Sequence, residues 1–301
     1  MAKTREIKRR IKAVGNIKRI TKTMQLIATA RFQAALRRAT AAKPYTQKIA
    51  ELVGELAAAA AGASAGGGLA HPLLKPPEPK TNRELLLVIT ANRGLCGGYN
   101  ANILRIATQQ LRESTGKQID LEVVGKKGVG YFKYANQAVA RVHNQFGDKP
   151  SYADVEALAG EYMKLFQEGK YDAVKVVYME FMSVARQKPV AVTLLPMQPP
   201  TDAKASGTSA AKSGAGVQYD FSPEPEKLLA TLLPLTVKSR LFQTFNEAIV
   251  GEQVARMIAM KSATDAAGKM GKALTRKFNR ARQAAITTEL TEIISGSAAL
   301  E

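Results

Sequence analysis

The sequence predicts an α/β fold in which long N- and C-terminal helices form an antiparallel coiled coil, joined to a small Rossmann-like α/β domain. Three observations predict this class. Apolar residues recur at helical spacing at both ends of the 301-residue chain, strand and helix patterns alternate between those ends, and aromatic residues make up only 6% without any tryptophan. A chain of this length can bury a sizeable core.

The first helix is predicted over about residues 3–63, within an N-terminal coiled-coil segment that spans 1–63. Its apolar side chains recur at steps of three or four, which is typical of one helix face, and Lys and Arg fill the other faces. Pro44 is predicted to bend this helix or to mark a joint. About sixty residues at ~1.5 Å each span roughly 90 Å, which indicates a coiled-coil arm or a shaft. The stripe consists of Ile7, Ile11, Val14, Ile17, Ile20, Met24 and Ile27.

The middle of the chain, residues 64–222, is predicted to be the α/β domain. A continuous apolar run at 84–91 is typical of a buried parallel strand, and strands then alternate with helices as in an open sheet. A Ser/Ala/Gly-rich stretch at 199–216 is predicted to be a low-complexity insertion. The other predicted strands are 119–124, 171–184 and 190–197, and the predicted helices are 100–112 and 152–168.

A second long helix is predicted over about residues 236–294, within a C-terminal segment that spans 223–301. A short helix at 223–233 is expected to precede it and to end at Pro234. Because neither stripe keeps a strict seven-residue repeat, the sequence predicts an irregular, locally overwound coil. The second stripe consists of Phe242, Phe245, Ile249, Val254, Met257, Ile258, Ala263, Ala266, Ala267, Met270, Leu274, Phe278, Ala281, Ala285, Ile286, Leu290 and Ile293.

The net charge is the unusual feature of the composition. It is +19, and residues 1–60 alone carry 14 basic and 3 acidic side chains. Such an excess predicts an acidic partner, which could be nucleic acid, an anionic membrane or an acidic protein surface. No apolar run reaches the ~18–20 residues of a membrane span, and the charged N-terminus lacks the apolar core of a secretory signal. We expect an intracellular protein that meets a membrane only through partners.

Glycine-rich segments are the candidates for a nucleotide site. The loop at 92–100 (NRGLCGGYN) could hold a phosphate at a helix N-terminus, but it lacks the G-x-G-x-x-G spacing. A tight turn that needs glycine for its backbone angles is the favoured interpretation. The segments at 125–130 (GKKGVG) and 268–272 (GKMGK) do not match a P-loop, and the first is interpreted as a strand-to-helix turn.

The sequence contains no constellation that demands catalysis. Cys96 is the sole cysteine and has no nearby histidine in sequence, so it is expected to be a buried small apolar residue. We expect no catalytic, cofactor-binding or metal-binding residues.

Two alternative functions remain open from the residues alone. The basic helices could bind nucleic acid, although no groove-recognition motif is present and aromatic residues do not interleave with the charges. A nucleotide-dependent enzyme that uses the loop at Gly94 is the other alternative.

Three blocks of the chain resemble the γ subunit family of F-type ATP synthases. Residues 7–38 (IKRRIKAVGNIKRITKTMQLIATARFQAALRR), with KPY at 43–45, resemble the family's N-terminal helix, and NRGLCGGYN resembles its central glycine block. Residues 255–300 resemble the C-terminal signature almost throughout. The resemblance spans the whole chain and keeps the order and spacing of the blocks.

The resemblance implies a rotor that has no active site of its own. In the family the two terminal helices form an antiparallel coiled coil inside a hexamer of α and β subunits, and that hexamer carries the nucleotide sites. A proton-driven membrane c-ring turns the γ subunit, which forces the catalytic sites through different conformations for ATP synthesis. The implied partners are the α and β subunits, the ε subunit and the c-ring at the globular foot, and no nucleic acid. The implied location is the cytoplasmic face of a bacterial membrane, as a peripheral protein.

The resemblance also implies five partner-contact residues. Met24 matches the methionine of the family's I-T-K-x-M run, and Arg256 lies in an A-R-M block that contacts β. Residues 293–300 resemble a tip held in an apolar bearing. The remaining three, Arg282, Gln283 and Thr287, fall in the R-Q-A-x-I-T block that contacts the surrounding hexamer.

Overall fold

A computed structural model describes residues 2–63, 71–114, 116–197 and 225–298. The chain forms two compact units. Unit 1 comprises residues 1–31, 95–97 and 253–301, and unit 2 comprises 32–94 and 98–252. The predicted insertion at 199–216 lies outside the described residues, and the predicted three-segment division of the chain stays a prediction. The elements are α1 (Ala2–Ala63), β1 (Arg83–Ile89), α2 (Tyr99–Glu113), β2 (Gln118–Val124), α3 (Lys126–Tyr134), β3 (Arg141–His143), α4 (Tyr152–Gln167), β4 (Ala173–Phe181), β5 (Gln187–Leu195) and α5 (Pro225–Ala298).

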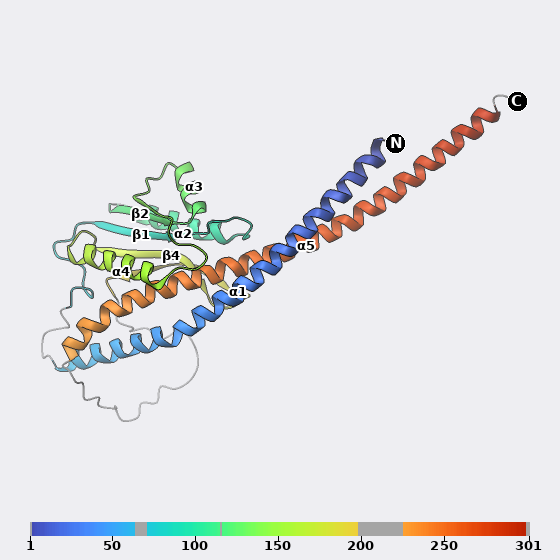
Figure 1. The fold of residues 1–301 in the computed structure, drawn as a ribbon. Coiled ribbons are helices and arrows are strands. Elements are labelled where there is room, and N and C mark those ends of the chain that lie inside the picture. The colour runs from blue at the N-terminus through green and yellow to red at the C-terminus, as the bar shows by residue number, and fades with distance from the viewer. Residues whose placement is uncertain (1, 64–70, 115, 198–224, 299–301) are drawn as a thin grey trace. The chain divides into compact units, whose positions relative to one another are not determined.

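Unit 2 contains a five-stranded sheet with the order β3-β2-β1-β4-β5 (Figure 1). The first four of these strands are parallel, and β5 pairs with β4 in the antiparallel sense. This arrangement confirms the predicted α/β class and the predicted strands. The sequence analysis missed β3, because a strand of three residues is too short to show an alternating pattern.

Strand β1 lies at the centre of the sheet, and its residues from Glu84 to Ile89 are buried. Leu85 and Leu87 belong to a core that also contains Val53 of α1, Tyr162 of α4 and Leu233 of α5. Because side chains alternate across a strand, the residues between them point to the opposite face of the sheet. On that face α2 packs against β1, β4 and β5, and α3 packs against β2.

Helix α5 runs through Pro234 without a break. The prediction that a short helix ends at this proline is therefore wrong. Proline inside a helix costs ~3 kcal/mol, but Leu229, Leu233 and Val237 are all 0–1% exposed around it. Full burial of each such side chain contributes about 1.5–3 kcal/mol, which outweighs the cost. Helix α1 likewise continues through Pro44.

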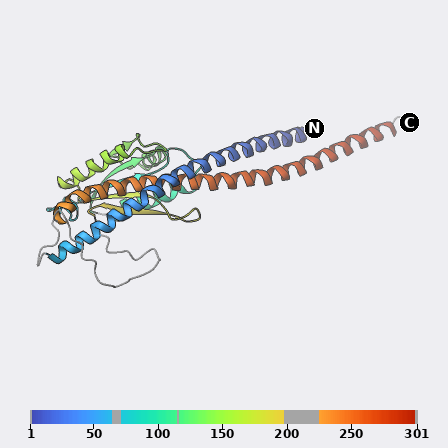
Figure 2. The ribbon, with the colours of Figure 1, turned by 60° about the horizontal axis from the view of Figure 1, so that its bottom comes forward.

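Unit 1 is a pair of antiparallel helices. Residues 2–31 of α1 and 253–298 of α5 lie side by side in two views, with the N- and C-termini at the same end (Figures 1 and 2). The predicted antiparallel pairing of the terminal helices is confirmed. Among the described residues, no helix is both long enough and apolar enough to cross a membrane.

The register of this pair is defined by contacts between the two helices. The hydroxyl oxygens of Thr21 and Thr264 are hydrogen-bonded at 2.8 Å. A methyl group at Gly271 would lie 3.9 Å from Val14 Cγ1. In both pairs the two residue numbers add up to 285.

The seam between the helices differs from the predicted apolar stripes. Ile17 and Ile20 are 52% and 59% exposed, and Met270 is 56% exposed, so none of them fills the seam. The residues that do face the partner helix follow mostly alternating steps of three and four, with Lys18 exposed between Val14 and Thr21, whereas the apolar stripes keep no strict seven-residue repeat. The seam consists of Ile7, Ile11, Val14, Thr21, Gln25 and Ala28 on α1, and of Met260, Thr264, Ala267, Gly271, Leu274, Phe278, Ala281 and Ala285 on α5.

Candidate partner-binding site

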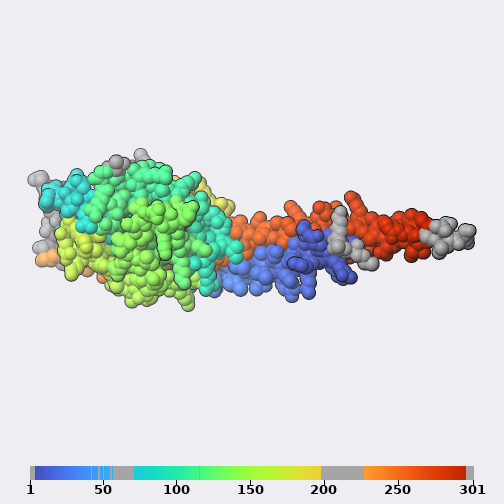
Figure 3. Space-filling view, turned by 90° about the horizontal axis from the view of Figure 1, so that it is seen from above, coloured from blue at the N-terminus to red at the C-terminus, as the bar shows by residue number. Residues whose placement is uncertain are grey.

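The shaft of unit 1 is the candidate site. Extending its register places Ala2 opposite Gln283, so α5 continues beyond the start of α1 as a single helix. Figure 3 shows this projection, with the red end of α5 reaching past the blue helix. Four large aliphatic side chains on the projection are 55–71% exposed: Ile286, Leu290, Ile293 and Ile294. Exposed apolar groups in such number on one stretch of helix indicate a surface that another molecule covers.

The five predicted contact residues lie at different levels of the shaft. Met24 is half-buried, while Arg282, Gln283 and Thr287 are exposed. Arg256 is 7% exposed, and its Nη1 donates a hydrogen bond to Gln253 Oε1 at 3.1 Å. The Thr287 hydroxyl donates to the Gln283 carbonyl oxygen at 3.0 Å, so these two residues occupy successive turns of one face. The structure does not gather the five into one cluster, and their partner role stays a prediction.

The basic side chains of the shaft are exposed. Lys8, Arg9, Arg10 and Lys12 all lie on the surface of α1, and the Arg10 guanidinium donates to Glu6 at 2.6 Å. On α5, Lys269 and five further cations are exposed as well. A shaft with this density of cations attracts acidic surfaces, and that attraction weakens as salt rises. The other five cations are Lys272, Arg276, Lys277, Arg280 and Arg282.

One exposed apolar residue of unit 1 was missed by the sequence analysis. Leu95 is 61% exposed and adopts a left-handed φ of 62°. The next residue but one, Gly97, has φ +56°, and a methyl group there would lie 3.8 Å from Ala259 Cβ of α5. The expected need for glycine backbone angles is thus confirmed at Gly97, and Cys96 between them is buried as expected. No sequence signal marks a lone leucine in a loop as exposed.

In unit 2, helix α5 occupies the place where open α/β sheets bind ligands. That place is the crevice at the carboxyl ends of the strands where the strand order reverses, here between β1 and β4. The Tyr99 hydroxyl at the start of α2 donates to the Ala248 carbonyl oxygen at 2.9 Å. A methyl group at Gly251 would lie only 3.2 Å from Met179 Cγ of β4. Because α5 packs closely at this place, a helix of the chain itself fills the crevice.

The segment predicted to be a strand-to-helix turn, 125–130, contains the junction at Gly125, but its remaining residues already belong to α3, which begins at Lys126. Gly125 has φ +94°, and a methyl group on it would overlap the Thr90 carbonyl oxygen. A methyl group on Gly128 would lie 2.7 Å from Thr90 Oγ1, which accepts a hydrogen bond from the Gly128 amide at 2.9 Å. Both glycines therefore allow α3 to start directly against β1.

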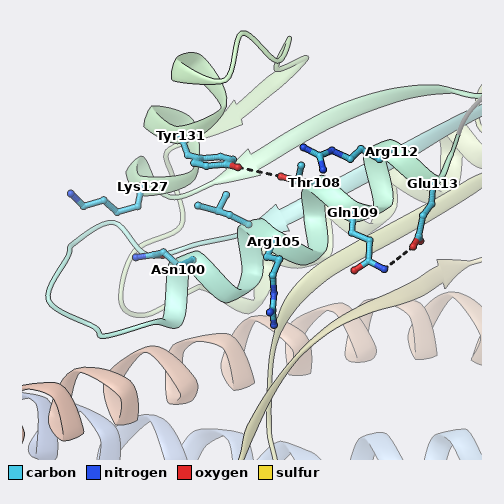
Figure 4. A pocket seen from close by; sticks show the side chains of 10 residues that line it. Asn100, Arg105, Thr108, Gln109, Arg112, Glu113, Lys127 and Tyr131 are labelled. Atoms are coloured by element: carbon cyan, nitrogen blue, oxygen red, sulfur yellow. Dashed lines mark hydrogen bonds between the residues drawn. The ribbon is translucent and has the colours of Figure 1, made fainter.

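A groove of about 780 Å³ lies between α2 and α3 (Figure 4). Its polar contacts include a 3.5 Å hydrogen bond between the hydroxyl groups of Thr108 and Tyr131. Arg105, Arg112 and Lys127 line it, but Figure 4 shows the side chains of Arg105 and Lys127 pointing away from each other. A phosphate group needs convergent donors, so the geometry does not favour a nucleotide site in this groove.

The described residues contain no group of three or more His, Cys, Asp and Glu side chains that could hold a metal ion. The most buried titratable cluster is Glu122, His143 and Tyr162. His143 Nε2 and the Tyr162 hydroxyl each lie 2.6 Å from Glu122 Oε2. Burial on its own raises the pKa of Glu122, but the hydrogen bonds from His143 and Tyr162 outweigh it and hold that pKa below its ordinary value.

Taken together, the fold and the site define a class of protein in which the two terminal helices form an antiparallel pair and the intervening chain forms an α/β unit. The family model for ATP synthase matches residues 3–300. The ATP synthase gamma chain of Rhodopirellula baltica is 44% identical over 304 residues, and that of Leptospira biflexa is 37% identical over 303 residues. Each alignment covers 100% of both chains. The chain belongs to the gamma-chain family of the ATP synthases.

A solved structure shares the fold. A chain in the OSCP/F1/c-ring assembly of the Euglena gracilis mitochondrial ATP synthase, in rotational state 3, matches with a TM-score of 0.65 and 17% identity. The match covers 99% of this chain and 95% of that chain. The nucleic-acid alternative finds no support in these comparisons.

Proposed function

We propose that this chain is the central rotor of an F-type ATP synthase, which transmits rotation from a proton-driven membrane ring to a catalytic hexamer. The observation that carries the proposal is the shaft of unit 1. Its seam is closed by the chain's own two helices, while basic and apolar side chains remain exposed around it. A shaft needs stiffness and an outer contact surface rather than an active site.

The partners follow from the family. The α and β subunits would surround the shaft, and the c-ring and the ε subunit would bind at the α/β unit. We propose no nucleic-acid partner, and membrane contact only through these subunits. The protein would be peripheral, on the cytoplasmic face of a bacterial membrane.

The five predicted residues are proposed as contacts to the hexamer. Arg282, Gln283 and Thr287 have exposed side chains near the end of α1 and can reach a surrounding subunit without any change in the shaft. Met24 is half-buried and would contribute the exposed part of its side chain. Arg256 is buried, so its substitution should lower the stability of the isolated chain as well as any partner contact.

A rotation assay tests the proposal. The hexamer is immobilised with this chain inside, and a visible probe is attached to a cysteine at position 134, where Tyr134 is 89% exposed. The native Cys96 is buried and should react slowly. We expect rotation in one direction that depends on ATP and pauses each third of a turn. A probe that stays fixed while the same complexes hydrolyse ATP contradicts a rotor role.

A further inference from the structure

Glu247 is a half-buried carboxyl side chain of unit 2, on the part of α5 that packs beside β4. Gln243, one turn earlier on the helix, donates a hydrogen bond from Nε2 to Glu247 Oε1 at 2.9 Å. The Tyr178 hydroxyl of β4 lies 3.5 Å from Glu247 Oε2, at the limit of a hydrogen bond. A carboxylate with so few donors around it is poorly solvated, and its charged form is therefore disfavoured.

The Gln243 amide gives a second, independent sign that an ionised carboxylate fits badly here. Its Oε1 atom is buried and receives no hydrogen bond from the described residues. Turning the amide over would bring that oxygen against the carboxylate of Glu247, and two acceptors would then face each other. Either orientation leaves a buried acceptor without a donor, which costs free energy. A neutral carboxyl group supplies the missing donor, because its O–H can donate to the amide oxygen.

The charged groups around Glu247 come from three elements. Strand β4 contributes Glu180, a half-buried carboxylate that repels the charge of Glu247. Helix α1 contributes Lys43, which attracts that charge but is exposed, so water and salt screen the attraction. Helix α5 itself carries Arg240, whose charge acts on the Tyr178 hydroxyl. The nearest strand therefore opposes ionisation of Glu247, and the one cation that favours it is exposed to solvent.

These surroundings shift the pKa of Glu247 upward. Burial of the side chain is the largest cause, and the repulsion from Glu180 adds to it. The hydrogen bonds from Gln243 and Tyr178 and the attraction of Lys43 lower the pKa, but they do not bring it back to its ordinary value. The folded chain thus holds a proton on Glu247 at pH values where the unfolded chain has released it.

We propose that Glu247 is a proton-binding site that tightens the packing of α5 against β4 when its carboxyl group is neutral. In the neutral state the carboxyl group donates to the Gln243 amide oxygen, and the repulsion from Glu180 disappears. In the ionised state the amide oxygen loses that donor and the two carboxylates repel each other across the contact between α5 and β4. The inference concerns unit 2 by itself and does not depend on the proposed rotor function.

The direction of the pH dependence follows from the raised pKa. The stabilising effect of the neutral carboxyl group is fully present below the ordinary glutamate pKa of about 4.3, and it is lost as the pH rises through the folded-state pKa. Glu122 has the opposite dependence, because its pKa is lowered in the folded chain. Glu247 therefore makes unit 2 less stable at alkaline pH, where Glu122 contributes its full stabilising effect.

Two matched variants of the full chain test the inference by thermal melting. Glu247→Gln is neutral at every pH, and its amide can donate to Gln243, so it mimics the protonated state. We expect it to melt about 2–4 °C above the parent at about pH 8, with a difference that shrinks as the pH falls toward about 5. Glu168→Gln is the control, because it removes the same charge from an exposed carboxylate whose nearest cation, Lys164 Nζ, is 3.9 Å away. Its melting temperature should follow the parent at each pH.

Carbon-13 NMR of the parent chain, labelled at the glutamate carboxyl carbon, measures the proton directly. The Glu247 signal is the one absent from Glu247→Gln, or from Glu247→Asp if the first variant does not fold. We expect this signal to titrate above the ordinary glutamate pKa of about 4.3, and to titrate at a lower pH in Glu180→Gln, where the repulsion is removed. A Glu247 signal that titrates at or below the ordinary value in the parent would overturn the inference.

Amide hydrogen exchange locates the structural effect of the proton. At about pH 8, the amides of β4 (Ala173–Phe181) should exchange more slowly in Glu247→Gln than in the parent, because tighter packing suppresses local opening. The amides of β2 should exchange alike in the two chains. An unchanged exchange rate in β4, or an equal change in every strand, would contradict a local effect on the contact between α5 and β4. Equal melting shifts in Glu247→Gln and Glu168→Gln would contradict it as well.

Discussion

Gly125 is a position where the backbone excludes any other residue. Its φ is +94°, and an added methyl group would overlap the Thr90 carbonyl oxygen. We expect Gly125→Ala to lower the free energy of unfolding by at least about 2 kcal/mol, because left-handed strain and a backbone overlap add together. Chemical denaturation followed by circular dichroism measures the loss.

Gly130 provides the matched control for this prediction. It lies in the same helix α3, with no atom within 4 Å of an added methyl group. Gly130→Ala should therefore raise the free energy of unfolding by about 0.5–1 kcal/mol, since alanine favours the helix. A similar loss for both variants would mean that α3 tolerates no substitution for reasons unrelated to Thr90.

The buried carboxylate Glu122 makes the stability of unit 2 depend on pH. Its pKa is held below the ordinary value, so its stabilising effect is present above that ordinary value and is lost as the pH falls through the folded-state pKa. Tyr162→Phe removes one of its hydrogen bonds and should raise the pKa of Glu122. Stability at neutral pH should fall by about 1–3 kcal/mol, and acid unfolding should begin at a higher pH than in the parent.

Acid titrations followed by circular dichroism check this prediction. Tyr134→Phe is the control, because Tyr134 is 89% exposed and should leave the acid transition where it is. An unchanged transition in Tyr162→Phe would show that His143 alone suffices to keep the carboxylate ionised.

Gln283 is the residue at which a partner contact can best be separated from stability. Its side chain is exposed near the point where α5 outruns α1. We expect Gln283→Ala to weaken assembly with the α and β subunits, or their coupling to rotation, while the melting temperature of the isolated chain stays the same. Thermal melts and binding measurements on the same preparation decide the point. Parallel losses in both would count against a contact role.

At the scale of elements, the sequence predicted most helices and strands closely, but it did not predict α3 (Lys126–Tyr134) as a helix. A continuous apolar run such as 84–91 has few alternatives in a chain of this composition, and the structure has a buried strand at Arg83–Ile89. Strand β3 was missed because three residues carry no pattern. The prediction that a helix ends at Pro234 was wrong. Burial of the surrounding leucines, which depends on tertiary structure, outweighs the free-energy cost of a proline inside a helix.

The seam of the shaft shows a different limit of sequence reasoning. Large apolar residues were expected to face the partner helix. Each step of three residues, from Ile11 through Ile17 to Ile20, instead rotates the side-chain direction by about 60° away from that helix. The true seam contains small and polar residues such as Thr21 and Gly271, which hydropathy alone does not select.

The basic residues of α1 are predicted to strengthen the association of the rotor with the hexamer through an electrostatic attraction that salt screens. Replacing Lys8, Arg9, Arg10 and Lys12 with glutamine should flatten the dependence of the rotor–hexamer dissociation constant on salt concentration. Titrations between low and high salt measure the slope for variant and parent. An unchanged slope would mean that these cations are merely solvated.

At the scale of the whole molecule, the chain has two parts. In the shaft, the residues of the seam contact each other across the two helices. In the α/β unit, the crevice where such sheets bind ligands is filled by helix α5 of the same chain. The general role could be predicted from the sequence because the three motif blocks span the chain. The individual contact residues could not be distinguished from packing residues in this way. Gln283 is exposed whereas Arg256 is buried, and this difference becomes visible only in the folded structure.

The central claim is that this chain is the single rotor of a larger complex. Native mass spectrometry of the tagged chain, recovered from its own cells at high salt, tests it most directly. We expect one copy of this chain with three copies each of two larger partner subunits. Recovery of the chain alone, or with nucleic acid that is lost as salt rises, would contradict the account.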